Sequence, residues 1–466
     1  MTWGIRMRIV VVGAGVVGFH LAEKLSDDHH KITIIDSNSE LIQRIDERLN
    51  VQAILGNAAS PRVLRKAKIG AADLVIAVTD RDETNITVSL LAKHLGAKKI
   101  VVRLRNAELS ADKELMELYG AQATVNPVTV TAEKIQRLIH NPGSFDVSSF
   151  ADGKLDLWGY EISKGSPLDG VILKDLKKRF DKLPGLIVAI FRDGEQSIAR
   201  GDDDLRAEDH IYVLMPEEEL KNFRKFVHPE SERVEKVVIA GATRLGLEVA
   251  RRVEQNPQKV RSLIVVEKDR ARAEKAAEEL NKALVLHGSV TDTSFVSENE
   301  IADADYFLSL ESDDAENLTN AMLIKKQGVR RVLVRSENDQ FLPVFQQTNF
   351  GEVVNPRRVT VSDILRVIRR GGVVAVSQVG ALGAEAREYE VTESQAVCGK
   401  KISDLNLPQD SIIGAIRRTD ENGGVEIFTA VGDTKILADD HVIIFALPAA
   451  VSEIEKVFTR RRGFLR

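Results

Sequence analysis

Short hydrophobic runs alternate with amphipathic stretches over the first part of the chain. Apolar runs at residues 7–12 and 31–35 enclose a stretch at 16–25 in which apolar residues recur every three to four positions, the period of a helix buried on one face. Further apolar runs, each preceded by polar, helix-forming sequence, follow at 74–78, 99–104 and 122–125. This alternation predicts a parallel, doubly wound sheet, which binds ligands at the carboxyl ends of its strands.

The same pattern occurs a second time at an offset of about 230 residues. The segment VIAVTDRDETNI at residues 75–86 returns as FLSLESDDAENL at 307–318, and TVNPVTVTAEKI returns as VVNPRRVTVSDI. The chain is therefore a tandem duplication of a two-part module.

The second part of each module contains short strands separated by Gly and Asp turns. We expect helices at residues 128–150 and 357–372, each after an Asn-Pro pair, and strands at 186–191 and 412–416. The predicted fold class is α/β, with two tandem doubly wound parallel-sheet (Rossmann-like) domains, each followed by a small α+β domain. We name them the first α/β domain, the first small domain, the second α/β domain and the second small domain, with expected bounds 1–127, 128–230, 231–356 and 357–466.

Composition limits the setting of the protein. The 466 residues include one cysteine, Cys398, which excludes an intramolecular disulfide and a cysteine-based zinc site and indicates a reducing cytoplasm. A net charge of −5 argues against nucleic acid as a partner. The longest apolar stretch, residues 373–384, is too short for a membrane helix, which needs about 18 or more apolar residues.

A glycine-rich turn lies between the first predicted strand and the first predicted helix. Gly13 allows the tight turn, Gly15 has no side chain to keep a pyrophosphate away from the backbone, and Gly18 lets the helix pack closely. The helix amides would then face the phosphates. Asp36, at the end of the next strand, would accept hydrogen bonds from the ribose hydroxyls, and its charge favours NAD(H) over NADP(H). The alternative is a glycine-rich turn without a ligand.

Four later residues of the first copy belong to the same crevice. Thr79 and Asp80 end one predicted strand, and Asn57 follows another and could line an adenine pocket. Arg103 lies on a central strand, where a charge is costly unless it is paired. We expect it to contact either a phosphate or a neighbouring subunit, or else to form a salt bridge to Asp80 or Glu83.

The second copy departs from this pattern at the turn. Thr243 replaces the middle glycine of the sequence that begins at Gly241, and its side chain would crowd a pyrophosphate. Arg244 adds a positive charge beside it, and Glu267 takes the place of Asp36. Either this copy binds a nucleotide in a shifted pose, or it is kept for its fold alone.

Catalytic machinery is missing from the sequence. A nicotinamide dehydrogenase needs a general acid or base near the hydride, and the strand-rich domains offer no such constellation. His210 and His441 occupy equivalent positions in the two copies, and we interpret them as structural residues at a turn before a strand. No metal-ligand cluster and no Gly-x4-Gly-Lys phosphate loop is present. These features favour a nucleotide-binding sensor over an enzyme.

With these motifs the chain resembles the RCK (TrkA-type) regulatory subunits of bacterial potassium transporters over essentially its whole length. Specific marks are VVGAGVVG, GNAASPRVLRKAKIGAADLVIAVTDRDETN and VVEKDRARAEKAAEEL. The resemblance implies a cytoplasmic protein, peripheral on the inner face of the cell membrane, that forms a homo-tetramer ring. It would gate an integral potassium-translocating subunit of the Trk type in response to NAD(H), with ATP or ADP at the same sites.

The resemblance also implies two nucleotide sites. The first would comprise Gly13, Ala14, Gly15, Val16, Val17, Asp36, Thr79 and Arg103, and the glycine turn and crevice above add Gly18, Asn57 and Asp80. The second would comprise Gly241, Ala242, Thr243, Arg244, Leu245, Glu267 and Glu311. Two other functions remain open: a soluble NAD-dependent oxidoreductase, and a nucleotide-binding scaffold without a transporter.

Overall fold

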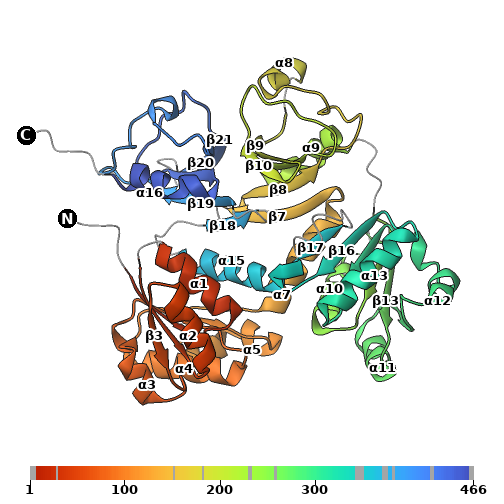
Figure 1. Ribbon diagram of the computed structural model, residues 1–466, viewed down its shortest axis with the longest axis horizontal. Helices are drawn as coiled ribbons and strands as arrows, with labels where there is room; N and C mark the ends of the chain where they lie inside the picture. Colours follow the sequence, from red (N-terminus) through yellow and green to blue (C-terminus); the bar gives the residue numbers. More distant parts are fainter. Residues whose placement is uncertain are drawn as a thin grey trace, which may run out of the picture.

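Two α/β domains and two small domains make up the molecule (Figure 1). The computed structural model describes residues 7–27, 30–150, 153–180, 183–228, 234–256, 260–341, 351–369, 376–379, 384–419 and 424–460. In the view of Figure 1 the α/β domains lie below, the small domains lie above, and two long helices run between the layers. The predicted fold class is confirmed.

The first α/β domain contains a six-stranded sheet in the order β3-β2-β1-β4-β5-β6, with every neighbouring pair parallel. Its strands are β1 (Arg8–Val12), β2 (Lys31–Asp36), β3 (Gln52–Leu55), β4 (Leu74–Ala77), β5 (Ile100–Arg103) and β6 (Ala123–Val125). Its helices are α1 (Val16–Asp27), α2 (Ser39–Arg48), α3 (Pro61–Lys66), α4 (Asp82–Leu95), α5 (Ala107–Ala111) and α6 (Lys113–Tyr119). The central strands are continuous apolar runs because helices cover both faces of the sheet.

The second α/β domain repeats this topology, with a parallel sheet in the order β14-β13-β12-β15-β16-β17. Its strands are β12 (Lys236–Ala240), β13 (Ser262–Glu267), β14 (Leu284–His287), β15 (Tyr306–Ser309), β16 (Arg331–Arg335) and β17 (Glu352–Val354). Its helices are α10 (Arg244–Glu254), α11 (Arg270–Glu279), α12 (Thr293–Glu298) and α13 (Asp314–Lys326). In both domains the order reverses beside the first strand, which places the glycine turn at the switch point of the sheet.

The two long helices are exchanged between the copies. α7 (Pro127–His140) follows the first sheet but packs on α10, and its Ile135 shares a core with Val249 of the second α/β domain. α15 (Pro356–Arg369) follows the second sheet, yet its Ile364 belongs to the core around Leu21 of α1. α7 and α15 also contact each other (Figure 1). Each α/β domain is therefore completed by the other copy's helix.

The two small domains have matching antiparallel sheets that pack against one another. The first, β10-β9-β11-β8-β7, contains β7 (Ser144–Phe150), β8 (Leu155–Glu161), β9 (Leu186–Arg192), β10 (Glu195–Ile198) and β11 (His210–Met215), with α8 (Leu176–Arg179) and α9 (Leu220–Val227). The second, β18-β19-β22-β20-β21, contains β18 (Val376–Val379), β19 (Ala384–Glu390), β20 (Ser411–Thr419), β21 (Val425–Thr429) and β22 (His441–Ala446), with α16 (Val451–Thr459). Leu157 and Leu214 of the first sheet share a core with Ala386 and Phe445 of the second.

One sequence expectation about these elements is wrong. The helix expected at 128–150 ends at His140, and the segment from Ser144 belongs to β7. Gly143, at φ +96°, turns the chain between them in the left-handed region that favours glycine. The helix expected at 357–372 is α15, and residues 370–372 lie outside the described part of the chain, as does the expected boundary at 230/231.

The paired histidines begin strands and lie beside carboxylates. His441 Nδ1 is 2.7 Å from Glu388 Oε1, and His210 Nε2 is 3.7 Å from Glu161 Oε2. Neither histidine lines the cavity at the glycine turns. Both positions agree with a structural role.

Candidate functional site

The glycine turn between β1 and α1 has two closed positions and one open position. Gly13 has φ +107°, and a Cβ there would lie 3.0 Å from Thr79 N. A Cβ on Gly18 would lie 1.7 Å from Gly13 O, so only glycine permits this approach of helix to turn. A Cβ on Gly15 would meet no atom within 4 Å. Gly13 and Gly18 are thus required by the fold, whereas Gly15 leaves space beside the turn.

Asp36, at the end of β2, ties that strand to the turn. Its Oδ2 accepts a hydrogen bond of 2.6 Å from Ala14 N, and its Oδ1 accepts one of 2.8 Å from Asn38 N. A carboxylate offers about four acceptor positions, so each oxygen keeps capacity for a ligand hydroxyl. The ribose contact of Asp36 stays a prediction, and the sequence did not indicate the bond to the turn.

Asn85 holds the strand end opposite the turn, a role that the sequence analysis missed. Its buried side chain accepts from Thr79 N at 2.9 Å and from Thr79 Oγ1 at 2.7 Å. Its amide donates to Thr79 O at 3.0 Å and to Arg103 O at 2.9 Å. One side chain therefore fixes the ends of β4 and β5. The signal was the asparagine at the same place in both copies of the DETN and DAEN segments.

Arg103 forms the salt bridge that was one of its two expected contacts. Its Nη1 lies 3.2 Å from Asp80 Oδ1, and Arg105 Nη2 lies 2.8 Å from the same oxygen. Arg103 is only 9% exposed, burial lowers the pKa of its guanidinium, and its buried Nε has no hydrogen-bond partner among the described residues. The pairing is thus incomplete, which leaves a buried donor at the crevice.

A cavity of about 1360 Å³ extends from the first glycine turn to the second α/β domain. Its walls also include Pro127 and Thr131 of α7 and the start of α15. From the predicted first site it is lined by Gly13, Gly15, Val16, Val17, Asp36, Asn57, Thr79, Asp80 and Arg103, but not by Ala14 or Gly18. From the predicted second site it is lined by Ala242, Thr243, Arg244 and Leu245, but not by Gly241, Glu267 or Glu311.

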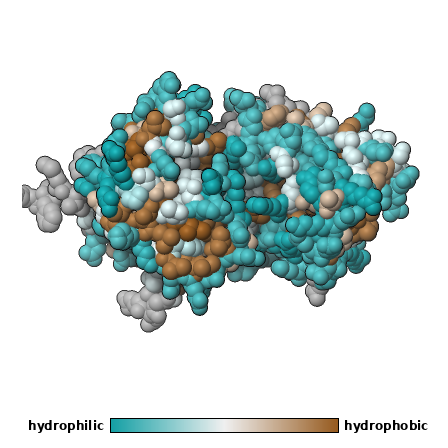
Figure 2. Space-filling model, turned by 90° about the horizontal axis from the view of Figure 1, so that it is seen from below, coloured by the Kyte–Doolittle hydropathy of each residue, from teal (hydrophilic) through white to brown (hydrophobic). Residues whose placement is uncertain are grey.

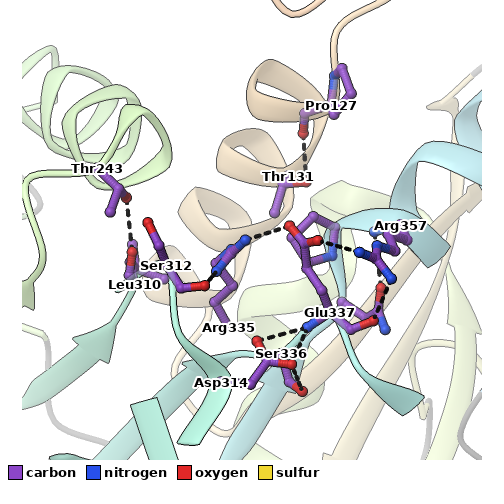
Figure 3. A network of polar contacts seen from close by, with 12 residues as sticks. Pro127, Thr131, Thr243, Leu310, Ser312, Asp314, Arg335, Ser336, Glu337 and Arg357 are labelled. Carbon is purple, nitrogen blue, oxygen red and sulfur yellow. Dashed lines mark hydrogen bonds and ion pairs between the residues drawn. The ribbon is translucent and has the colours of Figure 1, made fainter. Parts of the chain in front are cut away.

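Thr243 closes the second glycine turn. Its Oγ1 accepts a bond of 3.1 Å from Gly246 N, which caps α10, and donates one of 2.8 Å to Leu310 O beyond β15 (Figure 3). A helix amide that a phosphate would use is therefore already satisfied by the protein. Thr243 thus bridges the turn to the end of the neighbouring strand, a contact that sequence alone did not indicate.

Glu267 is fully buried, and its carboxylate accepts three hydrogen bonds from the protein. It accepts from Ala242 N at 2.9 Å, from Asp269 N at 2.8 Å and from Arg272 Nη2 at 2.8 Å. Arg272, which the sequence analysis did not single out, thus takes up acceptor capacity of Glu267 and lies on the cavity wall in its place. The equivalent Asp36 has no such partner among the described residues.

Glu311 follows β15 and lies beside the second turn. A Cβ on Gly241 would be 3.0 Å from Glu311 Cδ and 3.1 Å from Oε2. Burial, together with the nearby charges of Glu267 and Glu316, raises the pKa of the Glu311 carboxyl to about 7. Glu311 therefore places a buried carboxyl beside the second turn, where the first turn has Thr79.

Arg335 of the second copy, the counterpart of Arg103, is held by its own domain. Its Nη1 donates to Glu311 O at 2.7 Å and to Ser312 O at 3.1 Å, and its Nη2 pairs with Glu337. Arg357 of α15 lies 3.0 Å from the same Glu337 carboxylate (Figure 3). Arg335 and Arg357 thus share the single carboxylate of Glu337.

Comparisons with known proteins identify all four domains. The TrkA-N domain family matches residues 9–127 and 237–356, and the TrkA-C domain family matches 159–228 and 386–459. The chain is 32% identical to the Trk system potassium uptake protein TrkA of Vibrio alginolyticus, over 98% of this chain and 100% of that one. It is 33% identical to the TrkA homolog of Archaeoglobus fulgidus, over 97% and 100%.

Solved structures share the fold at lower identity. The GsuK RCK domain matches with a TM-score of 0.59 and 16% identity, covering 98% of this chain and 96% of that one. The GsuK channel bound to NAD matches with a TM-score of 0.59 and 17% identity, covering 98% of this chain and 80% of that one.

Proposed function

Since the chain belongs to the TrkA family, we propose that it is the cytoplasmic regulatory subunit of a Trk-type potassium uptake system. It binds NAD(H) or adenine nucleotides and thereby gates an integral membrane subunit that translocates potassium. Relatives that match over nearly the whole chain are named as potassium uptake proteins and not as enzymes. Family membership therefore favours binding over the oxidoreductase alternative.

The observation that carries the proposal is the open first turn. Gly15 leaves free space at the start of α1, where backbone amides and the helix dipole attract phosphate. Asp36 keeps acceptor capacity for the ribose, and Asn57 lies on the wall where an adenine would fit. A related fold, the GsuK channel, has been solved with NAD bound. These residues fit NAD(H) without rearrangement of the turn.

The same cavity supports a response to the number of phosphates. Arg103 and Arg105 line it from the first α/β domain, and Arg244 lines it from the second. A longer phosphate chain that begins at the first turn would approach cations of both copies. A ligand shifts the arrangement of domains only by its differential affinity for the two states, and such a contact distinguishes ATP from ADP.

Assembly and membrane attachment complete the proposal. In the described part of the chain no helix is long and apolar enough to cross a membrane, so potassium translocation is assigned to a separate integral subunit.

Figure 2 shows hydrophobic residues gathered on the underside of the first α/β domain, at the left of that view. Exposed apolar side chains of this domain are Leu55, Leu90 and Leu118. Surface of this kind supports association of copies into the proposed homo-tetramer ring.

The direct test is calorimetric titration of the full chain with NADH, NAD, ATP and ADP. Asp36→Ala removes charge-assisted bonds to the ribose, worth about 1.5–3 kcal/mol, and should weaken NADH binding about 10- to 150-fold. The matched control is Asp46→Ala, which removes an exposed carboxylate from α2 and should bind normally. Undiminished affinity in Asp36→Ala would refute the site, and turnover of NADH with carbonyl substrates would support the oxidoreductase alternative.

Gating is tested separately in vesicles that contain the membrane subunit. Potassium flux should depend on added nucleotide with the native chain and should lose that dependence with Asp36→Ala. Flux that ignores nucleotide in both cases would leave a nucleotide-binding scaffold as the better description.

A further inference from the structure

The two crevices share a backbone frame but differ at one side chain. In the first, Thr79 N donates to Asn85 Oδ1 at 2.9 Å; in the second, Glu311 N donates to Asn317 Oδ1 at 2.8 Å. The hydroxyl bond to the asparagine is kept as well. In the first crevice Thr79 Oγ1 donates it to Asn85, and in the second Ser309 Oγ donates it to Asn317 at 2.9 Å. The frame is thus satisfied without the side chain of residue 311, which is free to differ.

The Glu311 carboxyl lies beside the second glycine turn, and in folds of this kind the pyrophosphate of a dinucleotide lies over that turn. It is adjacent to Gly241, the first residue of the turn, and the residue is only 5% exposed. In the first crevice the equivalent position is occupied by Thr79, whose side chain is uncharged. An ionised carboxylate here would meet a pyrophosphate at close range in a poorly solvated site, which is strongly unfavourable.

The neighbouring cations are engaged elsewhere. Lys268, after β13, pairs with Glu316 of α13, and Arg272 of α11 pairs with Glu267 of β13. Arg335 of β16 binds the backbone oxygen of Glu311 and not its carboxyl. No ion pair joins the Glu311 carboxyl to a cation in the described part of the chain, and Glu267 and Glu316 face it with like charge.

We propose that Glu311 is the residue that makes nucleotide binding at the second crevice depend on protonation, so that this crevice accepts a dinucleotide in acid and rejects it in base, while the first crevice does not respond. The inference rests on the proposed nucleotide-binding function. Binding of the anionic pyrophosphate takes up one proton at the Glu311 carboxyl. The pKa of that group, about 7, places the transition in the neutral range.

The sign of the effect follows from linkage. A bound anion stabilises the protonated form of Glu311, so affinity is full below the pKa of the free protein and falls as pH rises through it. One proton per binding event corresponds to about a tenfold loss of affinity per pH unit above that pKa. His287 at the end of β14, whose Nε2 lies 3.2 Å from Lys268 O, provides a control substitution in the same region.

NADH is the suitable probe because its pyrophosphate does not titrate near neutrality, whereas terminal phosphates do, at about pH 6. The titrations use the full chain with Asp36→Ala, which weakens NADH binding at the first crevice, at about pH 6 and about pH 8.5. We expect NADH affinity to fall by at least tenfold between them. In the Asp36→Ala, Glu311→Gln chain we expect tight binding at both values, and in Asp36→Ala, His287→Gln the pH dependence should persist.

Three results separate the hypotheses. The role of Glu311 is overturned if the pH dependence survives Glu311→Gln. It is also overturned if neither Asp36→Ala chain binds NADH at the second crevice at either pH. In both cases, first-crevice binding in the native chain leaves the proposed function intact. Absence of NADH binding in the native chain at both values overturns the proposed function as well. A thermal melt checks folding: Glu311→Gln should raise the melting temperature above pH 7, because it removes a buried charge, and have less effect in acid.

Discussion

Replacing Gly15 by alanine should separate binding from folding in the first crevice. The added methyl group meets no atom within 4 Å, and the backbone there is not in the left-handed region, so the folded chain can accept it without strain. Alanine also restricts the unfolded chain, and the expected change in the free energy of unfolding is zero to a gain of about 1 kcal/mol. The methyl group nevertheless occupies the space through which a phosphate reaches the turn.

The loss of affinity can be estimated from the bonds that the methyl group prevents. One charge-assisted hydrogen bond from a backbone amide to phosphate contributes about 1.5–3 kcal/mol, so losing one weakens NADH binding about 10- to 150-fold. Gly18→Ala is the contrasting variant, because its Cβ would lie 1.7 Å from Gly13 O and must displace α1. That variant should cost about 1–3 kcal/mol of stability as well as binding.

The assay pairs calorimetric titration with thermal unfolding of the same samples. Gly15→Ala should melt at or above the native temperature and bind NADH weakly, whereas Gly18→Ala should melt lower. Native affinity in Gly15→Ala would refute the assignment of the pyrophosphate to this turn. A strongly destabilised Gly15→Ala would show that the space beside the turn is not free.

Two other substitutions test parts of this account. Thr243→Gly removes the cap of α10 and the bond to Leu310 O, so thermal unfolding should show a loss of about 0.5–1 kcal/mol of stability. Combined with Glu311→Gln, it should improve NADH binding at the second crevice, and unchanged binding would show that Thr243 is no barrier. Lys24→Met removes one of the two cations that pair with buried Glu385 and leaves Arg387 as the other. The Lys24 contact joins α1 to the second small domain, so its loss should cost about 1–3 kcal/mol, and a native melting temperature would show that this contact contributes nothing.

Much of the fold was predictable because its strands and turns have local signals. The apolar runs and glycine turns identified both sheets, and the repeat predicted the two small domains. The error at residues 141–150 arose because the polar, amphipathic sequence after α7 does not distinguish a helix from a half-buried edge strand such as β7. The glycine at position 143, with its positive φ, was the signal that should have ended the helix.

The site was predictable only where single residues carry their own chemistry. Spacing placed Gly15 and Asp36 at the same cavity, because the turn and the strand end are close in sequence. Arg272, in contrast, reaches Glu267 from a different element, and the bond from Thr243 to Leu310 O joins segments far apart in the chain. Such contacts depend on tertiary packing, and no local pattern indicates them.

The exchange of α7 and α15 gives the duplication a consequence for evolution. The chain has the internal arrangement of a dimer in which each partner lends the other a helix. In a true homodimer every substitution appears at both equivalent positions, because the subunits are copies. Joining the copies in one polypeptide removes that constraint, so position 15 can remain glycine while its counterpart becomes Thr243, and Thr79 can remain while its counterpart becomes Glu311. Covalent linkage thus allows the two crevices to carry different side chains at equivalent positions and to diverge in what they bind.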